Sequence, residues 1–413
     1  MTDFSDLPNP QRRALDLVRE VAAEKECRPY LVGGPVRDLL LGRHSIDVDV
    51  TLEDGSSTLA RALAKRLNGR VRSFPQFLTY KVSADGLPEI DIATARKERY
   101  RKPGALPTVT AGRLKDDLLR RDFSMNALAM DLVTGSMHDP AHGEQDIRTG
   151  VIRVLHDQSF LDDPTRIFRA IRFAGRLGFT LDPHTDALLR VAIVGGALGF
   201  ISRERIWREL FLAMEEAGAP KVLTMLRNSG ALDVLFGESG GQPPSPTLLE
   251  QVRDQVANNA ELDRQVLYTS ALLHGTEPTV AQLEGSGFSQ KRARNVLQIA
   301  RELPRYERAV AELVSDRQRF RLYKSVSREL LSILSVRRPE EQEHVARYHD
   351  YVKFKLPLRG NDLEVPLGPH VAKALERTRE AVFSGEIDAD EARSFAREMA
   401  IKYLSHEQPS DSK

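Results

Sequence analysis

The feature that most constrains this chain is a Gly-Gly turn followed closely by a pair of aspartates. The apolar run in Leu31-Val-Gly-Gly-Pro-Val-Arg-Asp38 ends in two glycines, and Asp47 and Asp49 follow inside a second apolar run. Side chains at i and i+2 of a strand point to the same face, so the two aspartates stand side by side. The opposite face of that strand is formed by Ile46, Val48 and Val50.

These two elements together predict a metal site beside a phosphate cradle. Neighbouring carboxylates repel, and one stays protonated unless a cation lies between them. Mg²⁺ takes such oxygen ligands and shares its shell with substrate phosphates. Gly33 and Gly34 let backbone N–H groups approach an anion. Residues 36–41 begin a helix whose N-terminus attracts phosphate, and Arg37 adds a fixed positive charge. Alone, a Gly-Gly pair predicts only a turn and an Asp-x-Asp pair only a polar surface.

Three ordered motifs resemble those of the class II tRNA nucleotidyltransferases, which add the CCA end of tRNA and share their head with bacterial poly(A) polymerases. The first motif is the segment 31–42 with Asp47-Val-Asp49. The second is Arg120-Arg-Asp-Phe-Ser-Met-Asn-Ala127, and the third is Asp162-Asp-Pro-Thr-Arg-Ile-Phe-Arg-Ala-Ile-Arg-Phe173. Gly360-Asn-Asp-Leu363 and Gly385-Glu-Ile387 resemble the family's C-terminal segment. The resemblance is thin between residues 230 and 350.

The resemblance implies an α+β nucleotidyltransferase head, a small mixed sheet with helices, followed by an all-α neck, body and tail. The apolar pattern agrees, because strand-like runs occur at 30–32, 46–52, 79–82 and 90–93 and helical spacing dominates after residue 158. We predict a catalytic head at 1–157, a neck with the nucleobase-reading motif at 158–236, a body at 237–316, a tRNA-binding tail at 317–405 and a disordered end at 406–413. The Pro- and Gly-rich stretch 238–246 is the best linker candidate.

The implied reaction moves a nucleoside monophosphate from ATP or CTP to the 3′-hydroxyl of tRNA and releases pyrophosphate. Asp47 and Asp49 are the implied catalytic residues and metal ligands, with Mg²⁺ as the cofactor, because two ions can stabilise the attacking and leaving oxygens together. Asp91 lies on a later strand-like run. Its role stays open, because the alternation Glu89-Ile-Asp91 is also typical of a half-buried strand.

The second motif predicts part of a nucleotide-binding site that also includes Gly34 and Arg37. Arg120 and Arg121 place two cations beside Asp122, whose carboxylate can accept a hydrogen bond from a ribose hydroxyl. Asn126 lies four residues beyond Asp122, on the same face of a helix. The alternative for these residues is a helix cap with a buried Asp–Arg pair.

The third motif carries the base specificity that the resemblance implies. Arg166, Arg169 and Arg172 recur every three residues and predict a basic stripe on one helix. By resemblance, Asp163 and Arg166 read the Watson–Crick edge of the incoming base, which suits carboxylate acceptors and guanidinium donors. Asp162 replaces the glutamate that the family often has there and is expected to orient Arg166. Arg169 and Arg172 are expected to face the triphosphate.

Three further segments carry expectations from the resemblance. Residues 95–115 are predicted to form a mobile loop linked to addition of the final A. Segment 202–210 resembles the neck helix, in which Trp207 is expected to pack in the core rather than stack on a base. His274-Gly275 falls where some relatives carry the His-Asp of a metal-dependent phosphohydrolase. Because glycine replaces the aspartate, we predict no such second activity.

Charge and composition indicate an RNA-binding protein of the cytoplasm. The net charge is only +1, but residues 96–121 carry nine Lys or Arg against three Asp or Glu, and residues 317–338 carry seven against one. Such clusters neutralise phosphates, although a solvated helix face is the alternative for the second, which includes Phe320 and Tyr323. The single cysteine is typical of a reducing compartment. We predict no membrane association, because the N-terminus is acidic without an apolar signal core and no apolar run reaches the ~20 residues that span a bilayer. No protein partner is implied.

Other functions remain open at this point. An enzyme that adds only A, or only CC, would share all three motifs. A poly(A) polymerase would differ in its primer, and its relatives usually carry Gly-Arg-Arg-Phe where this chain has Gly69-Arg-Val-Arg-Ser-Phe74. A non-catalytic RNA- or nucleotide-binding protein is disfavoured by the presence of both Asp47 and Asp49.

Overall fold

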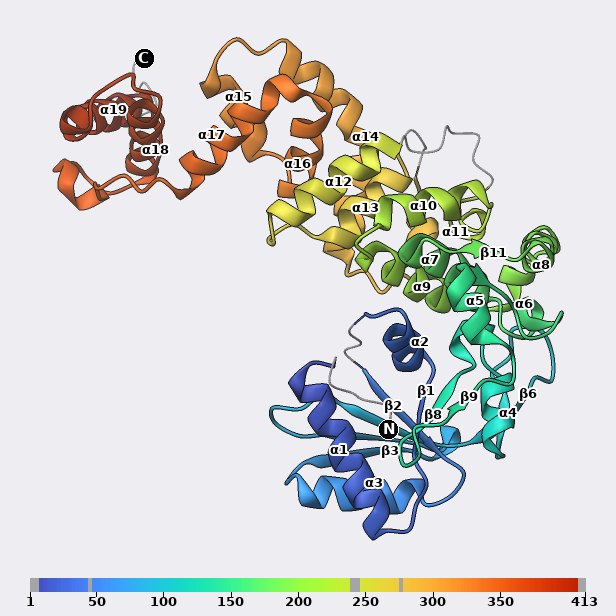
Figure 1. Cartoon of the computed structure of the whole chain (residues 1–413). Helices are drawn as coiled ribbons and strands as arrows, with labels where there is room; N and C mark the ends of the chain where they lie inside the picture. Colours follow the sequence, from blue (N-terminus) through green and yellow to red (C-terminus); the bar gives the residue numbers. More distant parts are fainter. Residues whose placement is uncertain (1–6, 44–46, 238–245, 275–277, 408–413) are drawn as a thin grey trace. The chain divides into compact units, whose positions relative to one another are not determined.

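The computed structural model describes residues 7–43, 47–237, 246–274 and 278–407. The chain forms two compact units, one of residues 1–243 with 281–287 and one of residues 244–280 with 288–413 (Figure 1). Five sequence-based expectations fall on residues outside the described ranges: the acidic N-terminus at 1–6, Ile46, the linker at 238–245, Gly275 and the end at 408–413. The division into head, neck, body and tail at the stated boundaries stays a prediction.

The first unit is built on a mixed sheet of seven strands in the order β3-β4-β5-β2-β1-β8-β9. The strands are β1 Tyr30–Val32, β2 Val48–Leu52, β3 Arg70–Phe74, β4 Thr79–Ser83, β5 Ile90–Thr94, β8 Ala129–Asp131 and β9 Met137–His138. Strands β2 and β5 are parallel, and the other neighbours are antiparallel. The predicted fold class, an α+β head with a helical remainder, is confirmed.

One face of the sheet is apolar and is covered by two helices. Val48 and Val50 of β2 and Ile90 and Ile92 of β5 are buried on it. Helices α1 (Asn9–Glu24) and α3 (Ser56–Arg66) cover this face (Figure 1). Because side chains alternate along a strand, the acidic residues between these apolar ones project from the other face.

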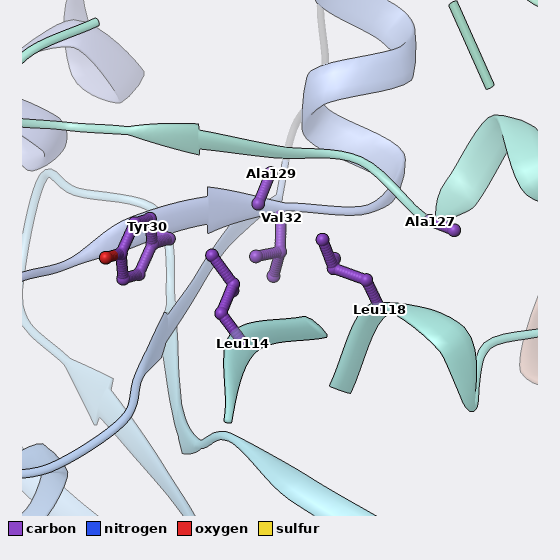
Figure 2. Packing of buried hydrophobic residues seen from close by; sticks show 6 residues of the cluster. All are labelled: Tyr30, Val32, Leu114, Leu118, Ala127 and Ala129. Carbon is purple, nitrogen blue, oxygen red and sulfur yellow. The ribbon is translucent and has the colours of Figure 1, made fainter. Parts of the chain in front are cut away.

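The other face is covered near β1 by a second, smaller core. Tyr30 and Val32 of β1 and Ala129 of β8 pack against Leu114 and Leu118 of α4 (Leu114–Leu119), as Figure 2 shows. Helix α4 therefore lies on the same side of the sheet as the acidic residues. The chain leaves α4 directly into the second motif, so this small core decides where that motif is placed.

Residues 95–115, which we expected to form a mobile loop, contain regular structure. Strands β6 (Arg96–Arg99) and β7 (Thr108–Ala111) form an antiparallel hairpin, and α4 begins at Leu114. The segment Arg96-Lys-Glu-Arg99 consists of charged residues only. It therefore lacks the alternation of apolar and polar residues from which a strand is predicted. Movement of this hairpin stays a prediction.

The rest of the first unit is mostly helical. Its elements are α2 Gly34–Leu40, α5 Gly143–Thr149, β10 Val151–Ile152, α6 Ser159–Asp162, α7 Thr165–Leu177, β11 Thr180–Leu181, α8 Pro183–Val194, α9 Arg203–Glu215, α10 Ala219–Asn228 and α11 Asp233–Phe236. Trp207 of α9 is 1% exposed and its indole N–H donates to the carbonyl of Glu284 at 3.2 Å. The expectation that Trp207 packs in the core is confirmed.

The second unit consists of helices. They are α12 Pro246–Asn258, α13 Arg264–Leu272, α14 Gln290–Ala311, α15 Asp316–Lys324, α16 Arg328–Arg337, α17 Gln342–Lys353, α18 Pro369–Phe383 and α19 Ala392–Glu407. Phe320 and Tyr323 of the second basic cluster are buried, and Phe320 stacks on Tyr351 at 5.1 Å between ring centroids. These aromatics therefore form core. In the described ranges, every helix is too short or too polar to cross a bilayer.

Candidate active site

Two carboxylates meet at the centre of the sheet. Asp49 of β2 lies directly opposite Asp91 of β5 in the parallel pair. Asp47 precedes Asp49 by two residues and is exposed. Lys81 of β4 is in register with Asp91, and its Nζ lies 2.9 Å from both carboxylate oxygens. The sheet thus brings Asp91, whose role the sequence left open, beside the predicted pair.

The electrostatics of this cluster make Asp49 hard to ionise. Burial and the neighbouring charge of Asp91 raise the pKa of Asp49 to about 6, while Arg121 acts in the opposite direction. Asp47 adds a smaller increase. The predicted repulsion between carboxylates is therefore present, but its main source is Asp91 on the adjacent strand rather than Asp47, which lies just before β2.

This donor set suits a hard divalent cation. Within the described ranges, no three acidic, histidine or cysteine side chains converge as a complete metal-binding group. Mg²⁺ in nucleotide enzymes is usually held by one or two carboxylates, with water and substrate phosphates as its other ligands. Asp47 and Asp49 could supply such carboxylates, and a cation between them would relieve the cost of ionising Asp49.

We expect Asp49 to titrate near pH 6 in the metal-free protein. Carboxyl carbon shifts in NMR spectra of selectively labelled protein, compared with those of D49N, would give its pKa. Because the protonated form prevails below pH 6 and the charged form above it, added Mg²⁺ or Mn²⁺ should lower the apparent pKa. A pKa near 4 without metal would show that the Asp49 carboxylate is solvated and is not affected by the charge of Asp91.

The Gly-Gly turn seats a guanidinium against the backbone. Gly33 follows β1 with φ +73°, and a Cβ there would lie 2.3 Å from Nη1 of Arg121. Gly34 begins α2. The Nε atom of Arg121 is buried and has no hydrogen-bond partner among the described residues. The turn, Arg121 and Asp49 thus lie together, which places a fixed positive charge beside the acidic cluster.

Asp117 anchors both arginines of the second motif. Its fully buried carboxylate accepts from Nε and Nη2 of Arg120 at 3.0 and 2.7 Å and from Nη2 of Arg121 at 3.1 Å. Burial opposes ionisation, but the two arginines hold the pKa of Asp117 below its ordinary value. Arg120 also donates to Glu98 at 2.9 Å. The alternative of a buried Asp–Arg pair therefore describes Arg120 well.

A buried chain of hydrogen bonds links four predicted nucleotide-binding residues. Arg37 Nη1 donates to Asn126 at 2.7 Å, Asn126 donates to Asp122 Oδ1 at 2.9 Å, and Arg169 donates twice to Asp122 Oδ2 at 2.8 and 2.6 Å. Despite burial, Arg169 and Asn126 lower the pKa of Asp122 to about 2. The expected helix from Asp122 to Asn126 is instead a 3-10 turn at Ser124–Asn126, which still brings the two side chains together.

The third motif is divided between two helices, and its arginines have different partners. Arg166 donates to Ser159 Oγ at 2.6 Å and to the carbonyl of Arg120 at 2.8 Å, where Asp162 was the expected partner. Arg172 donates to Glu216 at 3.0 Å. Asp163, between α6 and α7, accepts from Arg205 of α9 at 2.8 Å. The three arginines lie on one helix, α7, as predicted, but each guanidinium binds a different acceptor.

The residues that sequence reasoning missed are Lys81, Asp117 and Arg205. Asp117 had a signal, since it lies three and four residues before Arg120 and Arg121. Lys81 and Arg205 had none, because their acidic partners belong to other elements. The roles of all predicted site residues in binding and catalysis stay predictions.

Comparison with known protein families gives one match to a family model. Residues 29–153 match the poly A polymerase head domain. This range contains the Gly-Gly turn, the acidic cluster and the second motif, and it ends before the third motif.

Three relatives are named A-adding tRNA nucleotidyltransferase, and two of them match this chain along more than nine-tenths of its length. The one from Halalkalibacterium halodurans is 30% identical over 422 residues, which cover 98% of this chain and 95% of the relative. The one from Geobacter sulfurreducens is 33% identical over 404 residues, which cover 92% of this chain but only 46% of that longer protein. Among solved structures, one is the Thermotoga maritima CCA-adding enzyme complexed with tRNA. It superposes on this chain with a TM-score of 0.77 at 26% identity, and the superposed residues cover 96% of this chain and 95% of that enzyme.

Proposed function

This chain belongs to the class II tRNA nucleotidyltransferase family, and we propose that it transfers AMP, and CMP before it, from ATP and CTP to the 3′ end of tRNA. The observation that carries the proposal is the pairing of Asp49 with Asp91 beside the Gly33 turn and Arg121. A carboxylate cluster facing a fixed guanidinium is what metal-assisted transfer of a nucleotidyl group requires.

The chain's own residues supply binding and orientation. Divalent cations held by Asp47 and Asp49 would neutralise charge on the phosphate oxygens and favour the ionised 3′-hydroxyl. Arg121 is proposed to supply positive charge for a phosphate beside Asp49. Asp122, held ionised by Arg169 and Asn126, is proposed to accept from a ribose hydroxyl. Gly34 and Arg37 are proposed to line the same site.

Base selection is proposed to use Asp163 and Arg166. Both lie in the segment 159–166, which also contacts the second motif through the Arg120 carbonyl. Cytosine and adenine share an exocyclic amine that a carboxylate can accept from, whereas uracil and guanine lack it at that position. A protein pocket of this kind needs no nucleic-acid template.

The reaction has two possible scopes. Complete CCA addition, the sequence-based prediction, is supported by the similarity to the Thermotoga maritima enzyme along 96% of the chain. Addition of A alone is supported by the names of all three relatives. AMP transfer to tRNA is common to the two.

Nucleotide incorporation by the purified protein tests the proposal. We would offer labelled ATP, CTP, GTP and UTP separately, with Mg²⁺ or Mn²⁺, to three tRNA transcripts that end before the first C, after one C and after two. Addition of C, C and A is expected. Only A after CC would give the narrower enzyme, a long A tract on any RNA would indicate a poly(A) polymerase, and no incorporation at all would contradict the proposal.

A further inference from the structure

A row of charged side chains crosses the sheet from its edge to the acidic cluster. The strand register places Arg72 of β3 opposite Lys81 of β4. Lys81 is in turn opposite Asp91 of β5, which is opposite Asp49 of β2. Residues paired directly across neighbouring strands lie on the same face of a sheet. Two positive and two negative side chains therefore stand in line on the face that carries the predicted metal ligands.

Lys81 is held beside the acidic cluster by two carboxylates. Its Nζ donates to Glu89 Oε1 at 2.7 Å and to Asp91 Oδ2 at 2.9 Å. Burial lowers the pKa of the Lys81 ammonium, but the hydrogen bonds to Glu89 and Asp91 raise the pKa above its ordinary value, so the group is charged. Arg72 is its neighbour toward the sheet edge, so the ammonium cannot move that way without approaching a second cation.

The charges of Asp49 and Asp91 are already offset by cations of the chain. Burial and Asp91 raise the pKa of Asp49, whereas Arg121 and Lys81 lower it. A divalent cation that entered this cluster alone would lie close to the Lys81 ammonium, and like charges repel. A cation that arrives with a nucleoside triphosphate brings phosphate oxygens as ligands and their negative charge with it.

We propose that Lys81 is a positioning residue that competes with the divalent cation for the charge of the acidic cluster and makes cation binding depend on the nucleotide. This inference rests on the proposed function and deepens it, because it assigns the order in which the site is filled. In the nucleotide-free protein, the ammonium keeps the affinity for a lone cation low. The triphosphate supplies the negative charge that favours a cation beside Lys81, so nucleotide and cation strengthen each other's binding by the same factor.

Mn²⁺ binding to the nucleotide-free protein tests this role without any turnover. The EPR signal of hexaaqua Mn²⁺ falls as the ion binds, which gives a dissociation constant for each variant. K81Q removes the ammonium and should bind Mn²⁺ about tenfold more tightly than the wild type, the order that water-screened repulsion between an ammonium and a divalent cation gives. K81R keeps the positive charge and should bind Mn²⁺ as weakly as the wild type.

Two further variants show whether the gain arises at the acidic cluster. K65Q makes the same chemical change at an exposed position of α3, which covers the opposite face of the sheet, and should bind Mn²⁺ as the wild type does. Adding D49N to K81Q should abolish the gain, because a predicted ligand is lost. Trp207 fluorescence and thermal unfolding verify that each variant is folded, and Mn²⁺ should raise the melting temperature of K81Q more than that of the wild type.

The nucleotide dependence gives a second readout. A non-hydrolysable ATP analogue should strengthen Mn²⁺ binding more in the wild type than in K81Q. Equal Mn²⁺ affinity of the nucleotide-free wild type, K81Q and K65Q would overturn the proposal, and so would a gain that survives in K81Q with D49N. Neither outcome involves tRNA. A wild type that adds no nucleotide to tRNA, while K81Q still gains Mn²⁺ affinity, would contradict the proposed function and support the competition by Lys81.

Discussion

Replacing Asp49 with asparagine should reduce nucleotide incorporation at least about a thousandfold. An amide cannot hold a divalent cation as a carboxylate does, and the charge stabilisation that such a cation gives the transition state is worth several kcal/mol, where each factor of ten costs about 1.4 kcal/mol. Single-turnover incorporation of AMP into tRNA ending in CC, at saturating Mg²⁺, measures the effect.

The same variant should not be less stable than the wild type. The pKa of Asp49 is raised to about 6 in the folded protein, so its contribution to folding stability is fully present below the unfolded pKa and is lost as pH rises through 6. At pH 7.5 the ionised carboxylate opposes folding, and asparagine removes that charge. We therefore expect an equal or higher melting temperature, together with unchanged tRNA binding in a filter assay.

D85N is the matched control for D49N, because it replaces an aspartate by asparagine at an exposed turn in the same unit. It should keep incorporation within about twofold of the wild type, as surface substitutions away from a site usually do. Activity of D49N above about a tenth of wild type would contradict the placement of Asp49 at the reacting phosphate.

Replacing Asp117 with asparagine should destabilise the first unit by about 3–5 kcal/mol. The change leaves the guanidinium of Arg121, which is 17% exposed, without its carboxylate acceptor, whereas Arg120 keeps Glu98. Removal of one partner from a buried ion pair typically costs this much, because the remaining charge stays buried and unpaired. Urea unfolding followed by Trp207 fluorescence reports on this unit, since Trp207 is the single tryptophan of the chain.

The pH dependence of stability gives this prediction a second test. The pKa of Asp117 is depressed in the folded protein, so its stabilisation is present above the unfolded pKa and is lost as pH falls below it. The difference between wild type and D117N should therefore shrink as the pH is lowered below about 4.

D116N is the control for D117N. Asp116 is adjacent but only half-buried, and it accepts from the Arg113 N–H at the start of α4 and pairs with Lys97 at 3.4 Å. The side-chain oxygen of an asparagine there can still accept from the Arg113 N–H, so we expect a loss below about 1 kcal/mol. If D117N loses no more than D116N, the two arginines have other acceptors in solution and Asp117 does not anchor them.

The sequence alone determined the class of fold and predicted where an acidic site would lie. The glycines at 33 and 34, the spacing of Asp47 and Asp49 and the three ordered motifs predicted a strand, a turn and an acidic face, because strand periodicity and the conformational freedom of glycine are local properties. The head's mixed sheet and the helices that follow agree with that prediction.

Only the tertiary structure decided which of these groups meet. Asp91 lies opposite Asp49 because of the register between β2 and β5. Asp163 accepts a hydrogen bond from Arg205, which lies 42 residues away in the sequence. Spacing on one helix suggested a single stripe for Arg166, Arg169 and Arg172, yet each turned to an acceptor on a different element. Strand order and helix packing place distant residues together, and buried charges take whichever partner that packing supplies, so no local pattern could reveal those pairs.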